Sequence, residues 1–315
     1  MNNVGWIFPG QGSQSARMGQ KFMDRAPFVR VIDDISEATG RDIRAFITVL
    51  SDPDLKRTDR AQLGIFAVSM GIEACLRDAG LTPRFVAGHS LGHFSALTSA
   101  GVLSLQDAAL LVDARGGLMR DAGEHTQGGM AVVQGLLSDQ VADILAGTTL
   151  RVWPANLNLP TQIVVAGLAS DMEAARTALV EAGGKWVALN VSGAFHSPLL
   201  ATEAAAFANQ IAQTKFATPE CAIISNLNGQ ILRSPSEIAL DLQSHMTSQV
   251  RWTDVMDRFV SLSPKAMIEV GPGKVLTGLM LRYAPNHKPN STGLPALMDR
   301  AIGAQKTTKL ERSAA

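Results

Sequence analysis

Residues 85–95 read FVAGHSLGHFS, which places a short apolar strand, a Gly-x-Ser-x-Gly turn at residues 88–92 and the start of an apolar helix in succession. In such a turn the serine sits between strand and helix, so the residues two before and two after it must be small. Gly88 and Gly92 meet that need. This order of elements predicts an α/β fold in which Ser90 is a nucleophile.

The backbone around this turn offers hydrogen-bond donors for an oxyanion. The N–H of Leu91 opens the following helix, where the positive end of the helix dipole lies. A glycine-rich loop, PGQGSQ at residues 9–14, follows the apolar residues 4–8, which we expect to form the first strand. Its glycines let the backbone approach a ligand, so the N–H of Gln11 is a candidate second donor. We expect a helix over residues 18–25 after this loop.

Composition and charge exclude several classes of function. The 28 basic and 28 acidic residues are mixed along the 315-residue chain, so its net charge of zero gives no reason to bind nucleic acid or an anionic membrane. No apolar run reaches the roughly 18 residues of a membrane span, and the N-terminus lacks the basic segment of a signal peptide. We therefore expect a soluble cytoplasmic enzyme. Cys75 and Cys221 lie outside any CxxC or histidine cluster, which predicts free thiols and no metal site.

The order of the expected elements divides the chain into two units. Residues 130–190 alternate as strand, helix, strand, strand, helix, strand, which is the split βαβ pattern of a ferredoxin-like subdomain. Outside it, unbroken apolar strands alternate with helices and predict a parallel sheet covered on both faces. We expect a large α/β-hydrolase-like domain over residues 1–126 and 195–285, and an inserted ferredoxin-like subdomain over residues 127–194. The polar residues 286–315 are expected to form a C-terminal tail that is surface-lying or partly disordered.

A serine nucleophile requires a general base, and the chain offers six histidines. His196, in VSGAFHSP at residues 191–198, is the best placed by context, at the exit of the small unit. His89 and His93 sit within the turn itself, where an adjacent side chain usually points away from the serine hydroxyl. The remaining histidines lie in polar segments and are expected at the surface: His125, His245 and His287.

Several motifs, in their order and spacing, resemble the malonyl-CoA:acyl carrier protein transacylase family. They are PGQGSQ at 9–14, GHSLG at 88–92, RGGLM at 115–119, NLPTQIVVAG at 158–167, GAFHSP at 193–198 and EVGPGKVLTGL at 269–279. The resemblance covers both free-standing transacylases of fatty acid synthesis and discrete acyltransferases that serve polyketide synthases. It implies an enzyme that moves malonyl from coenzyme A to the phosphopantetheine thiol of an acyl carrier protein. No bound cofactor is implied, and we expect a monomer.

The resemblance assigns roles to individual residues. Ser90 resembles the nucleophile that accepts malonyl as an ester, and His196 resembles the base that activates it. The backbone N–H groups of Gln11 and Leu91 match the oxyanion hole. In this family a backbone carbonyl orients the histidine, and the matching segment is residues 249–251.

An arginine determines the expected class of substrate. Arg115 lies on the second helix after the turn in an otherwise apolar run, and a buried arginine requires an anion. The resemblance implies a bidentate clamp on the free carboxylate of malonyl, whereas the structural alternative is a salt bridge to Asp113 or Asp121. Met119 and Gln62 match residues that line the same pocket.

Other positions bear on specificity. Phe195 resembles the bulky residue of malonyl-selective members, which fills the space that a methyl branch would need. Asn158, Asn156 and residues 225–226 resemble polar positions along the acyl and pantetheine channel. The family usually has glutamate where this chain has His93, and this and similar departures indicate a specialised member, such as a discrete polyketide acyltransferase.

Three other functions remain open at this point. A malonyl-transfer subunit of a malonate decarboxylase would use the same residues with a different partner. An acyl hydrolase of the same fold would pass the acyl group to water, although Arg115 argues against it by marking a carboxylated substrate. A non-catalytic docking module would not need Ser90, His196 and Arg115 together.

Overall fold

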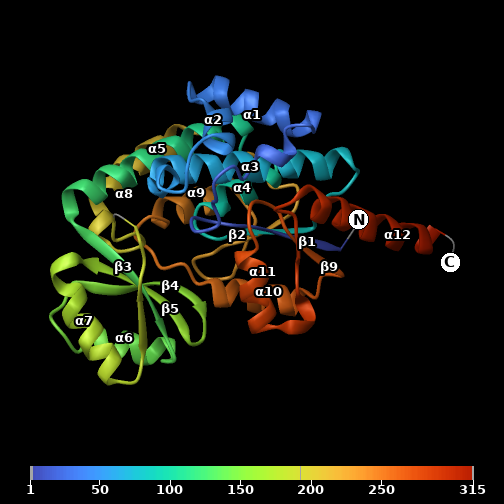
Figure 1. Cartoon of the computed structure of the whole chain (residues 1–315). Coiled ribbons are helices and arrows are strands. Elements are labelled where there is room, and N and C mark those ends of the chain that lie inside the picture. The colour runs from blue at the N-terminus through green and yellow to red at the C-terminus, as the bar shows by residue number, and fades with distance from the viewer. Residues whose placement is uncertain (1–2, 192, 314–315) are drawn as a thin grey trace.

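A larger and a smaller β-sheet organise the described part of the chain, and helices pack against both (Figure 1). Residues 3–191 and 193–313 are described here from a computed structural model. Parallel strands covered by helices confirm the expected α/β fold. Over these same residues, no helix combines the length and the apolar character that crossing a bilayer requires.

The larger sheet has the strand order β10-β9-β1-β2-β7-β8. Its strands are β1 (Val4–Phe8), β2 (Phe85–Gly88), β7 (Ala222–Ile224), β8 (Ile231–Leu232), β9 (Ala266–Glu269) and β10 (Asn290–Ser291). The described strands pair in parallel except β8, which runs antiparallel to β7. The sheet is therefore mixed, whereas a wholly parallel sheet was expected. Because Phe8 pairs with Gly88 at the ends of β1 and β2, the glycine-rich loop and the serine turn leave the sheet side by side.

Helices cover both faces of this sheet, which explains its unbroken apolar strands. Trp6 and Phe8 of β1 pack into one core, whereas Ile7 between them packs into another, because successive side chains of a strand point to opposite faces. The first core is built with α1 (Ala26–Thr39), α2 (Ile43–Thr48), α3 (Thr58–Asp78), α4 (Gly92–Ser99), α5 (Leu105–Thr126), α8 (Ala201–Gln213) and α9 (Pro235–Ser244). The second is built with α10 (Trp252–Leu262) and α11 (Val275–Tyr283), which lie below the sheet in Figure 1.

The smaller sheet is antiparallel, with the strand order β4-β5-β3-β6. Its elements are β3 (Gly128–Gln134), α6 (Ser138–Ala146), β4 (Val152–Leu159), β5 (Gln162–Leu168), α7 (Ala169–Glu181) and β6 (Lys185–Ala188). Ala131 and Val133 of β3 pack under these two helices, whereas Val132 between them contacts the core of the larger sheet. The alternation along β3 therefore directs one face of the small sheet towards the rest of the molecule.

One local expectation is wrong. Residues 18–25 hold only the short 3₁₀ helix η1 (Gln20–Phe22), because the α-helix begins at Ala26, where Pro27 occupies its first turn. Further short 3₁₀ helices are η2 (Asp54–Lys56), η3 (Pro198–Leu200) and η4 (Pro285–His287).

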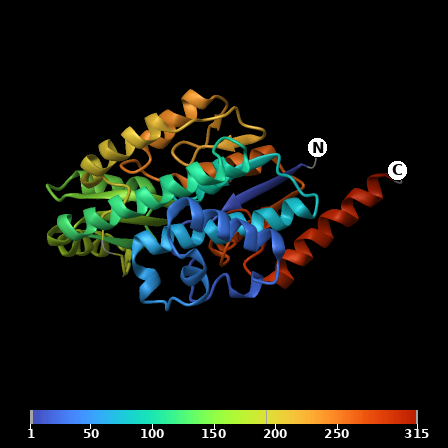
Figure 2. The ribbon, with the colours of Figure 1, turned by 90° about the horizontal axis from the view of Figure 1, so that it is seen from above.

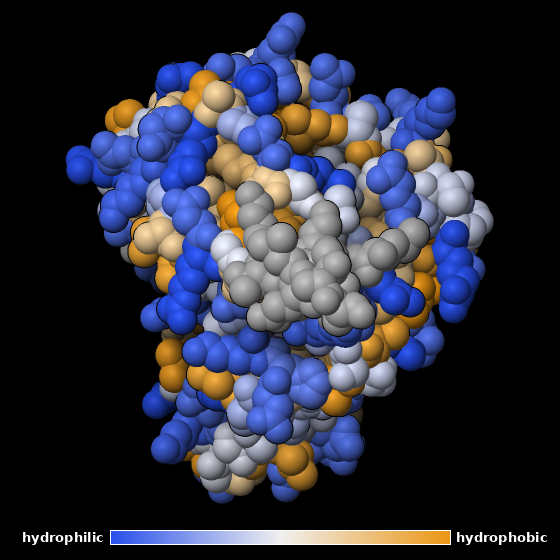
Figure 3. Space-filling model, turned by 90° about the vertical axis from the view of Figure 1, so that its right-hand side faces the viewer, coloured by the Kyte–Doolittle hydropathy of each residue, from blue (hydrophilic) through white to orange (hydrophobic). Residues whose placement is uncertain are grey.

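The C-terminal residues form regular elements that their polar sequence does not predict. β10 extends the larger sheet by pairing with β9, and α12 (Pro295–Ser313) follows it, although residues 314–315 lie outside the described part. Met298 and Ala301 of α12 are buried against the main core, and the helix then extends away from the sheets (Figure 2). On the face that lies to the right in Figure 1, hydrophilic side chains predominate, with apolar ones in small groups between them (Figure 3).

Candidate active site

Ser90 occupies the tight turn between β2 and α4. Its φ of +50° lies in the left-handed region, which costs energy for a residue with a side chain. A Cβ at Gly88 would lie 1.9 Å from the carbonyl carbon of Gly92, and one at Gly92 would lie 2.1 Å from the carbonyl oxygen of Phe8. The turn therefore excludes side chains at both glycines, as the reasoning from the sequence requires.

His196 lies against the serine hydroxyl. The Nε2 atom of His196 is 2.7 Å from Ser90 Oγ, and its Nδ1 atom is 3.1 Å from the carbonyl oxygens of both His245 and Ser248. Carbonyl oxygens only accept, so Nδ1 carries the proton and Nε2 is left to accept one from Ser90. This is the tautomer that a general base requires.

The carbonyls that orient His196 differ from those expected. In the segment 249–251, the backbone of Val250 is instead hydrogen-bonded to β4: its N–H donates to the Ala155 carbonyl, and its carbonyl accepts from the N–H of Leu157. The two carbonyls come from the turn that follows α9, where backbone acceptors lack intrahelical partners.

Burial controls the protonation of this histidine. Burial, together with the positive charge of Arg115, lowers the pKa of His196 to about 3. The imidazole is therefore neutral at neutral pH and available to take a proton. Burial likewise lowers the pKa of His89, whose ring lines the same cavity.

Arg115, on α5, is 1% exposed and lies beside the nucleophile. Its Nη2 atom donates to Ser90 Oγ at 3.1 Å, and its Nη1 atom donates to Gln62 Oε1. Burial lowers the pKa of Arg115 to about 9, which leaves the guanidinium charged at neutral pH.

The structural alternative for this arginine is wrong. Asp113 pairs with Arg41 at 3.2 Å, and Asp121 pairs with Arg120 at 2.6 Å. Across the described residues no carboxylate forms an ion pair with Arg115. A buried cation without a counter-ion is a candidate site for an anionic ligand.

A chain of side-chain hydrogen bonds connects this arginine to the glycine-rich loop. Gln62 Nε2 donates to Thr58 Oγ1 at 2.9 Å and lies 3.2 Å from Met119 Sδ. Thr58 Oγ1 in turn donates to Gln11 Oε1 at 2.8 Å. Thr58 was not expected from the sequence, although its place one helical turn before Gln62 on α3 puts both on one face.

The two expected oxyanion donors come from the serine turn, which holds Leu91, and from the glycine-rich loop, which holds Gln11. A Cβ at Gly10 would lie 2.4 Å from the carbonyl oxygen of His89, so the glycine-rich loop packs directly on the turn. Among the described residues, the backbone N–H groups of Gln11 and Leu91 have no hydrogen-bond partner. Both N–H groups are therefore available as hydrogen-bond donors.

A cavity of about 350 Å³ opens over Ser90 and His196. The larger domain contributes Gln11, Met119 and Phe195 to its wall. The small sheet contributes apolar side chains that the motif analysis missed, although their alternation along the strands is a usable signal: Met130, Val132 and Val164.

The polar positions expected along this cavity divide into two groups. Asn156 and Asn158 line it, and His89 Nε2 donates to Asn158 Oδ1 at 2.9 Å. Ser225 and Asn226 do not, because Ser225 donates to Asp241 and Asn226 donates to the Gly88 carbonyl behind the turn.

His245 is also misplaced by the reasoning from sequence. It is fully buried rather than at the surface, and its ring packs edge-on against that of His196, with 5.7 Å between ring centroids. The polar sequence around His245 does not predict this burial. It results from the packing of α9, whose C-terminal end brings His245 next to Asn226 behind the serine turn.

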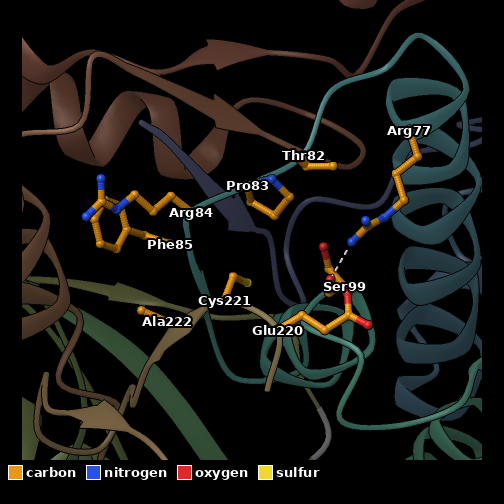
Figure 4. A pocket seen from close by; sticks show the side chains of 9 residues that line it. All are labelled: Arg77, Thr82, Pro83, Arg84, Phe85, Ser99, Glu220, Cys221 and Ala222. Carbon is orange, nitrogen blue, oxygen red and sulfur yellow. Dashed lines mark hydrogen bonds between the residues drawn. The ribbon is translucent and has the colours of Figure 1, made fainter. Parts of the chain in front are cut away.

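A second cavity, of about 410 Å³, lies beside Arg77, Arg84 and Cys221 (Figure 4). Arg77 already donates to Glu73 and to the carbonyl of Ser99. Burial raises the pKa of the Cys221 thiol to about 12, so this sulfur stays protonated and unreactive at neutral pH. The candidate base His196 and the cation Arg115 instead both contact the candidate nucleophile Ser90.

Comparison with known proteins identifies the family of the chain. The family model described as "Acyl transferase domain" matches residues 5–293. Malonyl CoA-acyl carrier protein transacylase of Bacillus subtilis is 32% identical over 311 residues, which cover 97% of this chain and 98% of that protein. Polyketide biosynthesis protein ThaF of Burkholderia thailandensis is 38% identical over 92% of this chain and 25% of its own length.

A solved structure extends the comparison to three dimensions. It holds the malonyl-transacylase PlMCAT in complex with AntF, a type II polyketide acyl carrier protein. The match has a TM-score of 0.91 at 30% identity and covers 96% of this chain and 99% of the other. The chain thus belongs to the acyl transferase domain family, among the malonyl CoA-acyl carrier protein transacylases.

Proposed function

We propose that this chain is a malonyltransferase that moves malonyl from coenzyme A, through an ester on Ser90, to the phosphopantetheine thiol of an acyl carrier protein. One observation carries the proposal: Arg115 is a buried cation without a carboxylate partner among the described residues, and it lies 3.1 Å from Ser90 Oγ. This arrangement suits a substrate that is both an acyl donor and a carboxylate.

In the first half-reaction, His196 Nε2 takes the hydroxyl proton as Ser90 Oγ attacks the thioester carbonyl carbon. The oxyanion is bound by the N–H groups of Gln11 and Leu91, and loss of one such donor typically costs about 3–4 kcal/mol in the barrier. Collapse of the intermediate breaks the carbon–sulfur bond. The coenzyme A thiolate then leaves with the proton from His196.

The second half-reaction runs through the same atoms. The phosphopantetheine thiol gives its proton to His196 Nε2, and its sulfur attacks the Ser90 ester. Breaking the ester bond returns the proton to Ser90 Oγ. Because burial keeps His196 neutral, it is ready to accept a proton at the start of each half-reaction.

In this proposal, selectivity comes from side chains around Ser90. Arg115 and Gln62 hold the free carboxylate, and a charge-assisted hydrogen bond contributes roughly 1.5–3 kcal/mol, about ten- to a hundredfold over acetyl. Met119 and Phe195 restrict the space around C2 of the acyl group. A single methyl group is worth only about 1–3 kcal/mol, so Phe195 gives preference rather than exclusion.

The architecture proposed with this function is an α/β-hydrolase-like domain over residues 1–126 and 195–285 with a ferredoxin-like subdomain over residues 127–194. The strand order β4-β5-β3-β6 and the two helices on one face support the second assignment. Residues 1–2 and 192 fall within these ranges but lie outside the described residues.

The proposal further includes a monomer without a bound cofactor, with malonyl-CoA as the substrate. A cytoplasmic location is part of it and is supported by the free thiols of Cys75 and Cys221. We propose a role in polyketide or fatty acid synthesis, supported by the identities with ThaF and with the Bacillus subtilis transacylase. The alternatives are a malonate decarboxylase subunit and an acyl hydrolase.

The deciding experiment is intact-mass measurement after incubation with malonyl-CoA, with and without a phosphopantetheinylated carrier protein. We expect a malonyl adduct on the wild type and on Ser95→Ala, a control at a buried serine of α4, but none on Ser90→Ala. The carrier protein should then acquire the malonyl group. An equal adduct on Ser90→Ala contradicts the nucleophile assignment, and discharge to water as fast as to every carrier favours the hydrolase.

A further inference from the structure

Behind the serine turn, His93 and Asp241 form a buried pair that the proposed mechanism does not use. His93 Nε2 of α4 lies 3.2 Å from Asp241 Oδ1 of α9 as an ion-pair contact without hydrogen-bond geometry, and their side chains are 0% and 5% exposed. The second oxygen of Asp241 accepts a hydrogen bond from Ser225, which follows β7. Burial of a carboxylate is costly unless it is paired, so this contact ties α4, α9 and the end of β7 together.

Asp241 lies one helical turn before His245, at the end of α9. The carbonyl oxygens of His245 and Ser248 are the two acceptors of the His196 Nδ1 proton, each at 3.1 Å. A displacement of the end of α9 would therefore move both acceptors at once. His93 and Asp241 hold that end against α4, the helix that opens at the nucleophile.

Ring contacts connect the same pair to His196 by a second route. The ring of His93 stacks on that of His245, with 5.6 Å between centroids and 17° between planes, and the ring of His245 packs edge-on against His196. Asn226 Nδ2 lies 3.0 Å from His245 Nε2 and donates to the Gly88 carbonyl at 2.9 Å. The cluster thus touches both the base and the backbone of the serine turn.

We propose that His93 and Asp241 are positioning residues for His196, which fix the end of α9 and the ring of His245 so that His196 Nε2 stays in hydrogen-bond contact with Ser90. The inference rests on the proposed function only in taking His196 as the base. A purely structural role is the alternative, in which the pair stabilises the core without affecting the rate of reaction per folded molecule.

Variants at Asp241 separate these two roles. Asp241→Ala removes the contact with His93, whereas Asp241→Asn keeps its shape and loses its charge. We expect Asp241→Ala to lower kcat by on the order of 10- to 100-fold, because small misplacements of reacting groups have effects of this size. KM for malonyl-CoA should not change, since Arg115 and Gln62 do not contact the pair. Asp241→Asn should retain more activity than Asp241→Ala.

Glu73→Gln is the matched control for these variants. Glu73 is buried on α3 and contacts Arg77 and Ser99, so this change also breaks a buried charged contact, away from the cavity over Ser90. We expect it to lower the thermal midpoint without lowering kcat. If the Asp241 and His93 variants likewise lose thermal stability but keep wild-type kcat, the positioning role is wrong.

A second readout does not depend on malonyl transfer. A small fluorophosphonate labels a serine activated by its histidine and needs neither Arg115 nor a carrier protein. We expect the labelling rate of Ser90 to fall in Asp241→Ala and His93→Asn by on the order of 10-fold or more, and to stay unchanged in Glu73→Gln. A wild type that is labelled on Ser90 but never acquires malonyl contradicts the proposed function while leaving this comparison intact.

The milder variants keep the inference testable if Asp241→Ala does not fold. Asp241→Asn and His93→Asn should then show the slower labelling in a smaller degree. Wild-type labelling rates in both folded variants would overturn the positioning role, even if malonyl transfer itself is demonstrated.

Discussion

Arg115 Nη2 lies 3.1 Å from Ser90 Oγ, within a core where the described residues provide no carboxylate to pair with it. The arginine thus lies beside the atom that we propose carries the acyl group, and no described carboxylate balances its charge. In the proposed function this contact links Ser90 to the class of acyl group that it accepts, which leads to the first prediction.

Arg115→Ala should lose malonyl loading while keeping or gaining acetyl loading. The change removes the charge that binds the free carboxylate, so the preference for malonyl should fall by about ten- to a hundredfold. Intact-mass measurement with malonyl-CoA and acetyl-CoA in parallel tests this. Arg120→Ala, on the same helix but paired with Asp121, is the control and should keep the wild-type preference. Unchanged selectivity in Arg115→Ala would refute the clamp.

Phe195→Ala should admit a branched acyl group. Phe195 lines the cavity next to His196, and its removal frees space where a methyl group at C2 would lie. We expect methylmalonyl loading to rise relative to malonyl by an amount equivalent to about 1–3 kcal/mol. Competition between the two coenzyme A thioesters measures the ratio. A ratio equal to that of the wild type means that another wall of the cavity excludes the branch.

The acid limb of kcat/KM should lie well below the ordinary pKa of histidine. Burial lowers the pKa of His196 to about 3, so the base remains neutral as the pH falls from neutral towards about 5, where an exposed imidazole of pKa about 6.5 would be mostly protonated. A pH profile of kcat/KM checks this directly. A rate that halves near the ordinary value would contradict the assignment of His196 as the buried base.

Acid should destabilise the fold through these same histidines. The pKa of His245 is lowered by burial, as is that of His196, so the folded state stays unprotonated where the unfolded chain binds protons. The contribution of these histidines to the free energy of unfolding is therefore fully present above about pH 6.5. Below that pH it falls by up to about 1.4 kcal/mol per pH unit for each histidine.

The contribution of one histidine can be isolated by difference. Urea unfolding over this pH range should show a shallower dependence for His245→Asn than for the wild type. Glu73 and Glu269 have raised pKa values, which act in the opposite direction, but they are common to both proteins and cancel. Identical slopes in the two proteins would argue against a neutral buried His245.

Gly92→Ala should destabilise the protein severely. The new Cβ would meet the carbonyl oxygen of Phe8 at 2.1 Å, and backbone cannot move aside as a side chain can. We expect a loss of at least the roughly 1–3 kcal/mol of an overpacked core, seen as a lower thermal midpoint. The control is Gly117→Ala in α5, where a Cβ meets no atom within 4 Å, so the better helix propensity of alanine should raise stability by about 1 kcal/mol. Equal midpoints for the two variants would contradict this reading of the turn.

Local features of the fold were predictable because neighbouring residues determine them. The alternation of strand, glycine turn and helix around Ser90 follows from the size of glycine and the period of the apolar side chains. The side chain of Ser104 caps α5 by accepting a hydrogen bond from the N–H of Asp107, a contact that spans only three residues of chain. The order of elements in the small sheet was readable for the same reason.

The choice of Ser90, His196 and Arg115 as candidates also came from the sequence, through residue types whose chemistry is specific. Their mutual distances did not. Gln62 and Thr58 join Arg115 to Gln11 only because α3 packs across α5 and the glycine-rich loop, and a residue pattern does not state which helices pack together.

The sequence by itself determined the nucleophile turn, the α/β class and the residue types of the site, since these depend on contacts between near neighbours in the chain. Only the tertiary structure decided which contacts position the residues of the site. The carbonyls of His245 and Ser248 that orient His196, the pairing of β10 with β9, and the meeting of His93 with Asp241 involve backbone groups or partners far apart in sequence. A backbone carbonyl is the same in every residue, so only packing decides which carbonyl accepts the hydrogen bond from Nδ1 of the histidine.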